Sequence, residues 1–385
     1  MTRYIPEEYR HNLSSYKYSG VDESLLSKHV LGPYWNKLVT FFPLTMAPNT
    51  ITGLGFLLVV FNVLTMLYFS PNMEAPCPNW AYFTFGVGLF VYQSFDAIDG
   101  KQARRTGTSG PLGELFDHGC DALNTSLEAL LVANALQLGQ SWWTVLSQLL
   151  PLFNFYLTTW EEYHTGTLYL SAFSGPVEGI IMLVILYFVT AFTGATFWVQ
   201  KFSDLVPGLP EIQMNHFLIA FGTVSLIGNI LTAFQHVIKA RRDKQLPVLP
   251  ALMGLAPFVG MSFVAYAWLN ASPQIVTAHM VPWVLYIGLS FGYTVGLMIT
   301  AHVTHQPYPM FNVSFVPLLV GALNANLPSI GIARLFGPHM ENMYLWSCLA
   351  FSAAAYAHFA LVVVNDICSY FDIWCFTIKH PKKIE

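Results

Sequence analysis

Hydrophobic residues along the chain occur in long runs separated by short polar stretches. A membrane-spanning helix needs about 20 mostly apolar residues. Ten segments meet this condition, at residues 49–70, 79–97, 115–137, 141–160, 176–197, 215–238, 249–269, 278–301, 313–333 and 344–370. The third is the least hydrophobic because it carries Asp117, Asp121 and Glu128, and the ninth is interrupted by Asn324 and Asn326. The pattern predicts an all-α polytopic membrane bundle of about ten transmembrane helices.

Lysine and arginine are distributed unevenly between the two sides that ten spans define. Both termini and the loops after even-numbered spans share one side, and the other side receives only Lys201 and Arg334. The first side receives Arg3, Arg10, Lys17, Lys28, Lys37, Lys101, Arg104, Arg105, Lys239, Arg241, Arg242, Lys244, Lys379, Lys382 and Lys383. Positive residues are enriched in cytoplasmic loops, so both termini are expected to be cytoplasmic.

Residues 23–42, before the first span, form an amphipathic pattern. Leu31, Trp35, Leu38 and Phe42 follow one helical face. Such a helix can lie in the membrane interface, or it can pack on the bundle as an ordinary amphipathic helix. The fold class therefore includes an N-terminal interfacial amphipathic helix, with packing on the bundle as the alternative.

Composition excludes several classes of protein. The chain is 54% hydrophobic and 10% charged, well below the charge of an average soluble domain. A net charge of -4 gives no basic surface for nucleic acid. The five cysteines follow no paired spacing, which indicates neither a disulfide framework nor a zinc site. The polar N-terminus is not expected to act as a cleavable signal peptide.

Four aspartates gather where the second span meets the third. Asp96 and Asp99 are spaced i, i+3, and Asp117 and Asp121 are spaced i, i+4, so each pair shares a helical face. The short glycine-rich connection predicts an antiparallel hairpin that brings both pairs together near the cytoplasmic end. Charged carboxylates at a membrane interior are costly unless they are compensated. Two divalent cations, Mg²⁺ or Mn²⁺, would compensate them and bind a diphosphate.

Residues around the aspartates suit a phosphate ligand. Gly100 and Gly113 allow close approach of the backbone, and Arg104 is placed to donate two hydrogen bonds to a phosphate. The alternative is a solvated loop in which the aspartates pair with Lys101, Arg104 and Arg105.

The stretch from Asp96 to Asp121 resembles the signature of the CDP-alcohol phosphotransferase family, Asp-x2-Asp-Gly-x2-Ala-Arg-x8-Gly-x3-Asp-x3-Asp. The chain matches its fixed positions at Asp96, Asp99, Gly100, Ala103, Arg104, Gly113, Asp117 and Asp121. The wider sequence is similar to the eukaryotic choline/ethanolamine phosphotransferases, most strongly over residues 45–180.

The resemblance implies a role for each matching residue. Asp96, Asp99, Asp117 and Asp121 would be metal ligands. Asn49, in an Ala-Pro-Asn motif, would face the cytidine nucleotide, and Gly100, Arg104 and Gly113 would line the CDP site. In the family the fourth aspartate, here Asp121, is often the base that accepts the acceptor's proton. We favour His118 as the base, because a free imidazole titrates near neutrality; orienting an aspartate is the alternative role.

The resemblance also implies substrates and a cellular setting. The donors would be CDP-choline and CDP-ethanolamine, the acceptor diacylglycerol, and the products a phospholipid and CMP. The enzyme would be an integral membrane protein of the endoplasmic reticulum or Golgi, surrounded by membrane lipid, and a homodimer. Residues 1–48 would form the cytoplasmic N-terminus, 49–210 the catalytic helices, and 211–385 the C-terminal helices for lipid access and a possible dimer interface.

Other polar residues permit only weaker expectations. Glu161, Glu162 and His164 end the fourth span, where they would contact the head group or form a polar helix end. Glu178, inside the fifth span, needs a partner, which a quaternary ammonium and nearby aromatic rings could supply. His302 is expected to satisfy local packing. Two other functions remain open: a family member that uses another alcohol or acceptor, such as inositol, and a cation-binding membrane transporter.

Overall fold

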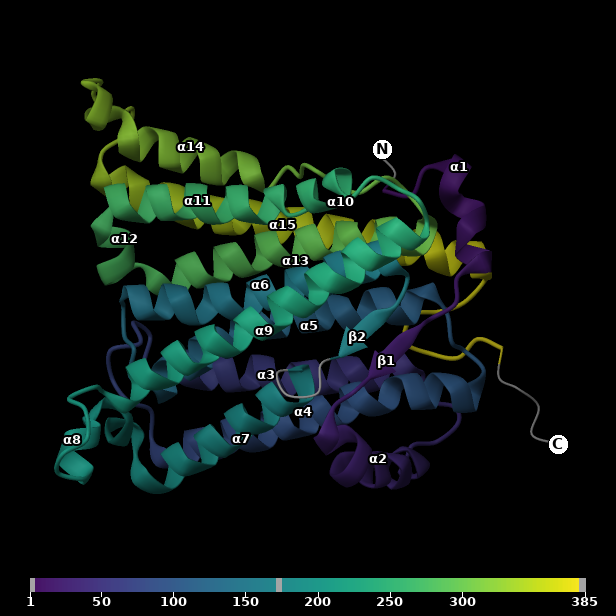
Figure 1. Cartoon of the computed structure of the whole chain (residues 1–385), viewed down its shortest axis with the longest axis horizontal. Coiled ribbons are helices and arrows are strands. Elements are labelled where there is room, and N and C mark those ends of the chain that lie inside the picture. Colours follow the sequence, from purple (N-terminus) through teal and green to yellow (C-terminus); the bar gives the residue numbers. More distant parts are fainter. Residues whose placement is uncertain (1–3, 171–174, 381–385) are drawn as a thin grey trace.

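The computed structural model describes residues 4–170 and 175–380, and almost all of its secondary structure is helical (Figure 1). The longer helices run roughly parallel or antiparallel to one another along the bundle. The α-helices are α1 (Glu7–Arg10), α2 (Gly32–Leu38), α3 (Pro48–Phe69), α4 (Asn79–Thr106), α5 (Pro111–Ala135), α6 (Trp142–Thr165), α7 (Pro176–Thr193), α8 (Phe202–Leu205), α9 (Met214–Asp243), α10 (Leu249–Met253), α11 (Ala256–Ala271), α12 (Pro273–Ala278), α13 (Met280–Thr304), α14 (Phe315–Asn326) and α15 (Pro338–Phe371).

Each of the ten predicted hydrophobic segments overlaps one of these longer helices, several of which extend beyond the predicted bounds. Within the described residues, six helices are long and apolar enough to cross a membrane, which confirms an all-α membrane protein. Carboxylates on α4, α5 and α6 lower the hydropathy of those helices, and α14 is short because it ends at Asn326 and continues as a 3₁₀ turn, Leu327–Ile330. The count of about ten spans stays a prediction.

Helix α13 lies at the centre of the bundle, between α5, α6 and α15 (Figure 1). Glycines on one of its faces permit close packing: a Cβ atom at Gly288 would lie 2.5 Å from Ser126 Cβ of α5. One at Gly296 would lie 2.4 Å from the Phe359 ring of α15. Small residues let membrane helices approach closely and gain dispersion contacts. The C-terminal helices are thereby joined to the helices that carry the aspartates.

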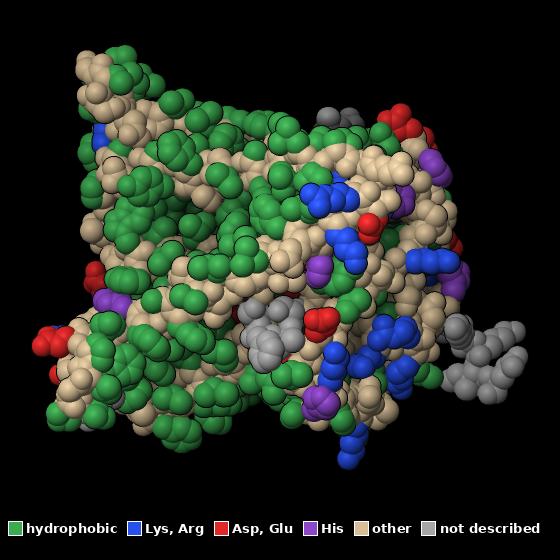
Figure 2. Space-filling view, in the orientation of Figure 1, with side chains coloured by type: hydrophobic (Ala, Val, Ile, Leu, Met, Phe, Trp, Pro, Cys, Tyr) green, Lys and Arg blue, Asp and Glu red, His purple; other side chains and the backbone are tan. Residues whose placement is uncertain are grey.

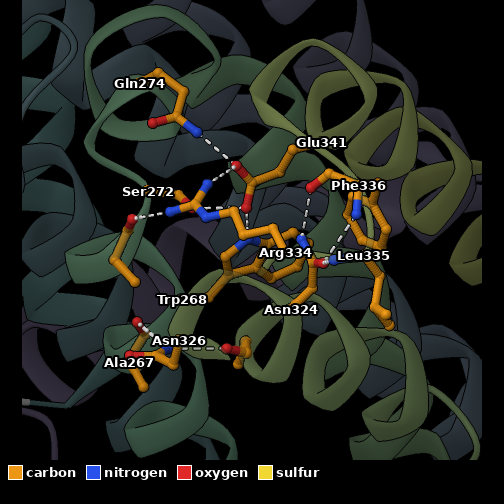
Figure 3. Close-up of polar contacts among 12 residues, drawn as sticks. Ala267, Trp268, Ser272, Gln274, Asn324, Asn326, Arg334, Leu335, Phe336 and Glu341 are labelled. Atoms are coloured by element: carbon orange, nitrogen blue, oxygen red, sulfur yellow. Dashed lines mark hydrogen bonds and ion pairs between the residues drawn. The ribbon is translucent and has the colours of Figure 1, made fainter. Parts of the chain in front are cut away.

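A buried carboxylate joins α11, α12 and α15 at the end of the bundle opposite α1 and α2 (Figures 1 and 3). Glu341 is completely buried and accepts hydrogen bonds from Trp268 Nε1 at 2.8 Å and Ser272 Oγ at 2.6 Å. Gln274 donates to its other oxygen, and Arg334 lies 3.4 Å from that oxygen. Every partner of Glu341 lies outside its own helix, so the carboxylate holds separate elements together.

The N-terminal segment packs on the bundle through a short parallel pairing that the sequence did not predict. Strand β1 (Gly20–Asp22) pairs with β2 (Leu168–Leu170), directly after α6. The predicted amphipathic helix is a π-helical turn, Ser27–Leu31, followed by α2 and a 3₁₀ turn, Val39–Phe41. Trp35 is buried with Ile51 of α3 and Ile98 of α4. The apolar face therefore packs on the bundle, as the alternative interpretation held, while a position in the membrane interface stays a prediction.

Basic residues gather at one end of the molecule. On the face in Figure 2, Lys and Arg cluster at the end that carries α1, α2 and the C-terminal end of α9, and hydrophobic side chains dominate the rest. Arg10 lies 3.6 Å from Asp366 near the end of α15, so the first and last helices meet at this end. Arg3, Lys382 and Lys383, which contributed to the predicted charge bias, lie outside the described residues.

Candidate active site

The aspartates lie on a helical hairpin at the basic end of the bundle. Helix α4 ends at Gly107, which adopts a left-handed conformation with φ of 69° that favours glycine. Helix α5 begins at Pro111, whose fixed φ suits the first helical position. The turn reverses the chain, so that Asp96 on α4 faces Asp117 and Asp121 on α5. The predicted hairpin is confirmed.

Three of the four aspartates form a compact cluster of oxygen atoms. One carboxylate oxygen from each of Asp96, Asp117 and Asp121 lies within 4.8 Å of the other two. The Oδ1 atoms of Asp96 and Asp117 are buried and have no hydrogen-bond partner within the described residues. Buried, unpaired carboxylate oxygens are costly unless a cation binds them, and oxygen ligands suit Mg²⁺ and Mn²⁺. The donor set therefore fits the predicted divalent cations.

Neighbouring side chains orient these carboxylates. Thr52 of α3 donates a hydrogen bond of 2.5 Å to Asp99 Oδ2. Tyr92 donates to Asp121, and Gln93 Nε2 donates to Asp96 Oδ2 at 3.3 Å. Asp99 follows Asp96 by one helical turn but does not belong to the compact cluster of three. Thr52 could not be predicted from the sequence, because only the rotation of α3 against α4 brings it to Asp99.

The aspartates line a cavity of about 1710 Å³ with two unlike parts. Its mouth is polar and includes the aspartates, Asn49, Gly100, Arg104, Gly113 and His118. Its inner part lies between α6, α7 and α9 and is lined mainly by apolar side chains such as Leu150, Leu183, Leu218 and Leu226. The cavity therefore joins a charged site to an apolar limb between membrane helices.

The predicted nucleotide residues lie around the mouth of the cavity. A Cβ atom at Gly113 would meet nothing within 4 Å, and one at Gly100 would meet only the Arg104 guanidinium, at 3.6 Å. Arg104 is exposed and forms no ion pair within the described part of the chain. Lys101 donates to Asn36 and Arg105 to the Val39 carbonyl. The solvated-loop alternative, in which these bases pair with the aspartates, is therefore wrong.

The segment that follows α15 covers one side of the mouth, a feature that the sequence analysis missed. Asn49 is buried, and its Nδ2 lies 3.6 Å from Cys375 Sγ. Thr50 Oγ1 donates a hydrogen bond of 2.6 Å to the Phe376 carbonyl. Trp374 and Lys379 also line the cavity. The segment after α15 thus meets the start of α3 at the predicted nucleotide site.

His118 and Tyr18 face the cavity from opposite parts of the chain. His118 follows Asp117 on α5 and lines the cavity, as a candidate base must. Tyr18 precedes β1 and also lines the cavity, although more than half of its surface is exposed. Desolvation, followed by the negative charges of Glu162 and Asp117, raises the pKa of Tyr18 to about 12. Its hydroxyl therefore stays protonated near neutral pH and can donate a hydrogen bond.

The structure gives partners to three polar residues for which the sequence permitted only weaker expectations. Glu178 Oε1 accepts hydrogen bonds from Ser24 Oγ at 2.5 Å and from the Leu26 amide, whereas its Oε2 is buried without a partner within the described residues. A quaternary ammonium as a partner of Glu178 stays a prediction. Glu161 pairs with His236 of α9. His302 does more than fill space, because its ring nitrogen lies within 4.8 Å of carboxylate oxygens of Glu114 and Glu162.

Polar atoms in the inner part of the cavity were also missed. Glu128 is buried in the middle of α5, and one of its oxygens accepts a hydrogen bond of 2.6 Å from Tyr187 of α7. Its other oxygen and Asn124 Oδ1 are buried without a partner within the described residues. The only signal in the sequence was Glu128 itself, a carboxylate within a predicted span. Such a residue is a candidate for function in a membrane protein.

Comparison with known proteins agrees with this site. Residues 45–206 match the family model described as CDP-alcohol phosphatidyltransferase. Cholinephosphotransferase 1 from Saccharomyces cerevisiae is 39% identical over 99% of the chain and 99% of its own length. Choline/ethanolaminephosphotransferase 1 from Arabidopsis thaliana is 37% identical over 96% and 97%, and its namesake from Saccharomyces cerevisiae is 36% identical over 99% and 100%. Together with the aspartates on α4 and α5, this likeness shows that the chain belongs to the CDP-alcohol phosphatidyltransferase family.

Proposed function

We propose that the protein transfers phosphocholine or phosphoethanolamine from CDP-choline or CDP-ethanolamine to diacylglycerol, with release of CMP. The observation that carries this proposal is the cavity, which joins a cluster of aspartates to an apolar limb between α6, α7 and α9. A water-soluble nucleotide and a lipid alcohol can meet only at such a junction. The names of the full-length relatives support the choice of head group and acceptor.

Asp96, Asp99, Asp117 and Asp121 would hold two Mg²⁺ or Mn²⁺ ions. When bound, these ions would neutralise the diphosphate and stabilise the charge that develops on the departing CMP. Asn49, Gly100 and Gly113 surround the cytidine and diphosphate. Arg104, which has no partner ion among the described residues, binds the diphosphate oxygens.

The reaction is a direct displacement. The hydroxyl oxygen of diacylglycerol forms a bond to the β-phosphorus, and the bond from that phosphorus to the bridging oxygen breaks. CMP leaves with the bridging oxygen, and His118 accepts the hydroxyl proton, with Asp121 as the alternative base. Positioning and electrostatic stabilisation are sufficient for this chemistry, so no covalent intermediate with the protein is required.

Diacylglycerol reaches the site laterally between α7 and α9. Ile180 and Leu183 of α7 and Leu218 and Leu226 of α9 line the apolar limb that leads to the aspartates. We place both termini in the cytoplasm on the charge bias, and the enzyme in the endoplasmic reticulum or Golgi on the family resemblance. Residues 49–210 form the catalytic helices, and residues 211–385 shape lipid access and the interface of a homodimer.

The test is product formation by the full-length chain in lipid nanodiscs. Wild type receives diacylglycerol with CDP-choline, CDP-ethanolamine or CDP-inositol, with Mg²⁺ or with EDTA, and CMP and phospholipid are measured. We expect metal-dependent product with choline or ethanolamine, and a rate at least about 100-fold lower in Asp117→Asn because the metal site loses a charged ligand. Asp243→Asn, an exposed change at the end of α9, controls for the loss of one charge.

Each result decides between the candidate functions. Product from CDP-inositol alone would assign a different alcohol to the same family. A wild-type protein that releases no CMP from any donor with any metal would reject the phosphotransferase and favour the transporter alternative, which predicts cation flux into sealed liposomes instead.

A further inference from the structure

Beside the aspartate site lies a second cluster of metal-ligating side chains. Glu114 lies in the first turn of α5, Glu162 in the last turn of α6 and His302 in the last turn of α13. One ligand atom from each lies within 4.8 Å of the other two, and His302 Nε2 lies 4.0 Å from Glu114 Oε1. The three residues come from three helices that are far apart in the sequence, so folding alone brings them together.

The carboxylates of this cluster are buried without compensation. The Glu114 side chain is only 3% exposed, and neither of its oxygens has a hydrogen-bond partner within the described residues. No lysine or arginine in the described part of the chain lies within ion-pair distance of Glu114 or Glu162. The neighbouring carboxylate of Glu161, by contrast, has a partner, because His236 pairs with it. Two adjacent buried carboxylates therefore require a cation or protons.

We propose that Glu114, Glu162 and His302 bind a further divalent cation of the transition-metal class, such as Zn²⁺ or Mn²⁺, at a site separate from the aspartates. An imidazole with two carboxylates is a ligand set for these metals, whereas Mg²⁺ and Ca²⁺ favour oxygen ligands alone. The aspartate cluster contains oxygen ligands only. The two neighbouring sites thus differ in their ligand atoms, because only the second offers an imidazole nitrogen, which favours Zn²⁺ over Mg²⁺.

The position of this site gives the cation a positioning function. It joins α5 and α6 to the central helix α13, close to the mouth of the cavity, which Glu114 and Glu162 also line. His118 lies one helical turn beyond Glu114 on α5. A cation there holds the start of α5, and with it the aspartate cluster, against the C-terminal half of the bundle.

The test counts bound metal rather than activity. Full-length protein in nanodiscs carries Asp117→Asn and Asp121→Asn, which disable the aspartate site, and is stripped with a chelator and titrated with Mn²⁺, free ion being followed by electron paramagnetic resonance. One bound Mn²⁺ that Zn²⁺ displaces is expected. Adding Glu114→Gln or His302→Ala lowers the affinity at least about tenfold, whereas the matched change Glu161→Gln leaves it unaltered.

A second measurement does not depend on how well Glu114→Gln folds. His302→Cys retains a ligand, so Co²⁺ added to that variant produces a thiolate-to-cobalt charge-transfer absorption that is absent from the parent. No Mn²⁺ or Zn²⁺ binding in the parent, unchanged binding in Glu114→Gln, or no new absorption in His302→Cys would overturn the proposal and leave a shared proton as the compensation for the two glutamates.

Discussion

A single hydroxyl links α3 to the aspartates of the proposed metal site. Thr52 Oγ1 donates a hydrogen bond of 2.5 Å to Asp99, and such partners of metal ligands commonly change metal affinity by about 10–100-fold. We expect Thr52→Val to raise the Mg²⁺ concentration for half-maximal rate about tenfold while the rate at saturating Mg²⁺ falls less. Thr65→Val is the matched control, because Thr65 bonds only to its own helix at Phe61. Equal responses of the two variants to Mg²⁺ would contradict this role.

A second prediction at the scale of a single residue concerns His118, the proposed general base. Loss of a general base typically lowers the rate by about 10²–10⁴. We expect this loss in kcat for His118→Ala, with the KM for the CDP-alcohol changed by less than about twofold, because the nucleotide residues lie elsewhere around the mouth. Steady-state kinetics with each substrate varied in turn measures both quantities. If kcat stayed close to that of wild type, Asp121 rather than His118 would be the general base.

The sequence predicts individual elements well where the interactions are local. The hairpin of α4 and α5 follows from two short spacings and a glycine-rich turn, and Asp96, Asp117 and Asp121 lie together as expected. Contacts between elements that are far apart in the sequence could not be predicted in this way. Thr52 reaches Asp99, and Glu128 and the segment after α15 reach the cavity, only through helix rotation and packing, which hydrophobic periodicity does not specify.

Helices α11, α12 and α15 depend on one buried carboxylate. Glu341 is fully buried, and its removal would leave Trp268, Ser272 and Arg334 without their common partner (Figure 3). Breaking a buried ion pair on one side typically costs about 3–5 kcal/mol. We expect Glu341→Ala to lower the thermal unfolding midpoint in detergent clearly. Glu211→Gln, which removes an exposed partner of Lys201, should leave it almost unchanged; similar midpoints for both variants would refute the argument.

At the scale of the whole molecule, the helices surround a cavity with a polar mouth and an apolar limb. Its mouth lies at the basic end of the bundle, where both halves of the chain contribute residues, and its limb runs between α6, α7 and α9. Only the packed bundle creates this connection. The carboxylates at one end of the apolar helices line its polar mouth, and the space between α6, α7 and α9 forms its apolar limb.

Lateral access between α7 and α9 can be tested by filling the limb. Gly222 of α9 lines the cavity, and a Cβ atom there would meet nothing within 4 Å, so Gly222→Trp can fold while its ring occupies the acceptor's path. We expect the KM for diacylglycerol to rise at least about tenfold with the KM for the CDP-alcohol unchanged, because the proposed nucleotide site lies at the mouth. Gly228→Trp is the matched control, since Gly228 has equal room on the same helix but faces away from the cavity. If both tryptophans affect diacylglycerol alike, the acceptor does not pass between these helices; if only Gly222→Trp does, the limb is its route.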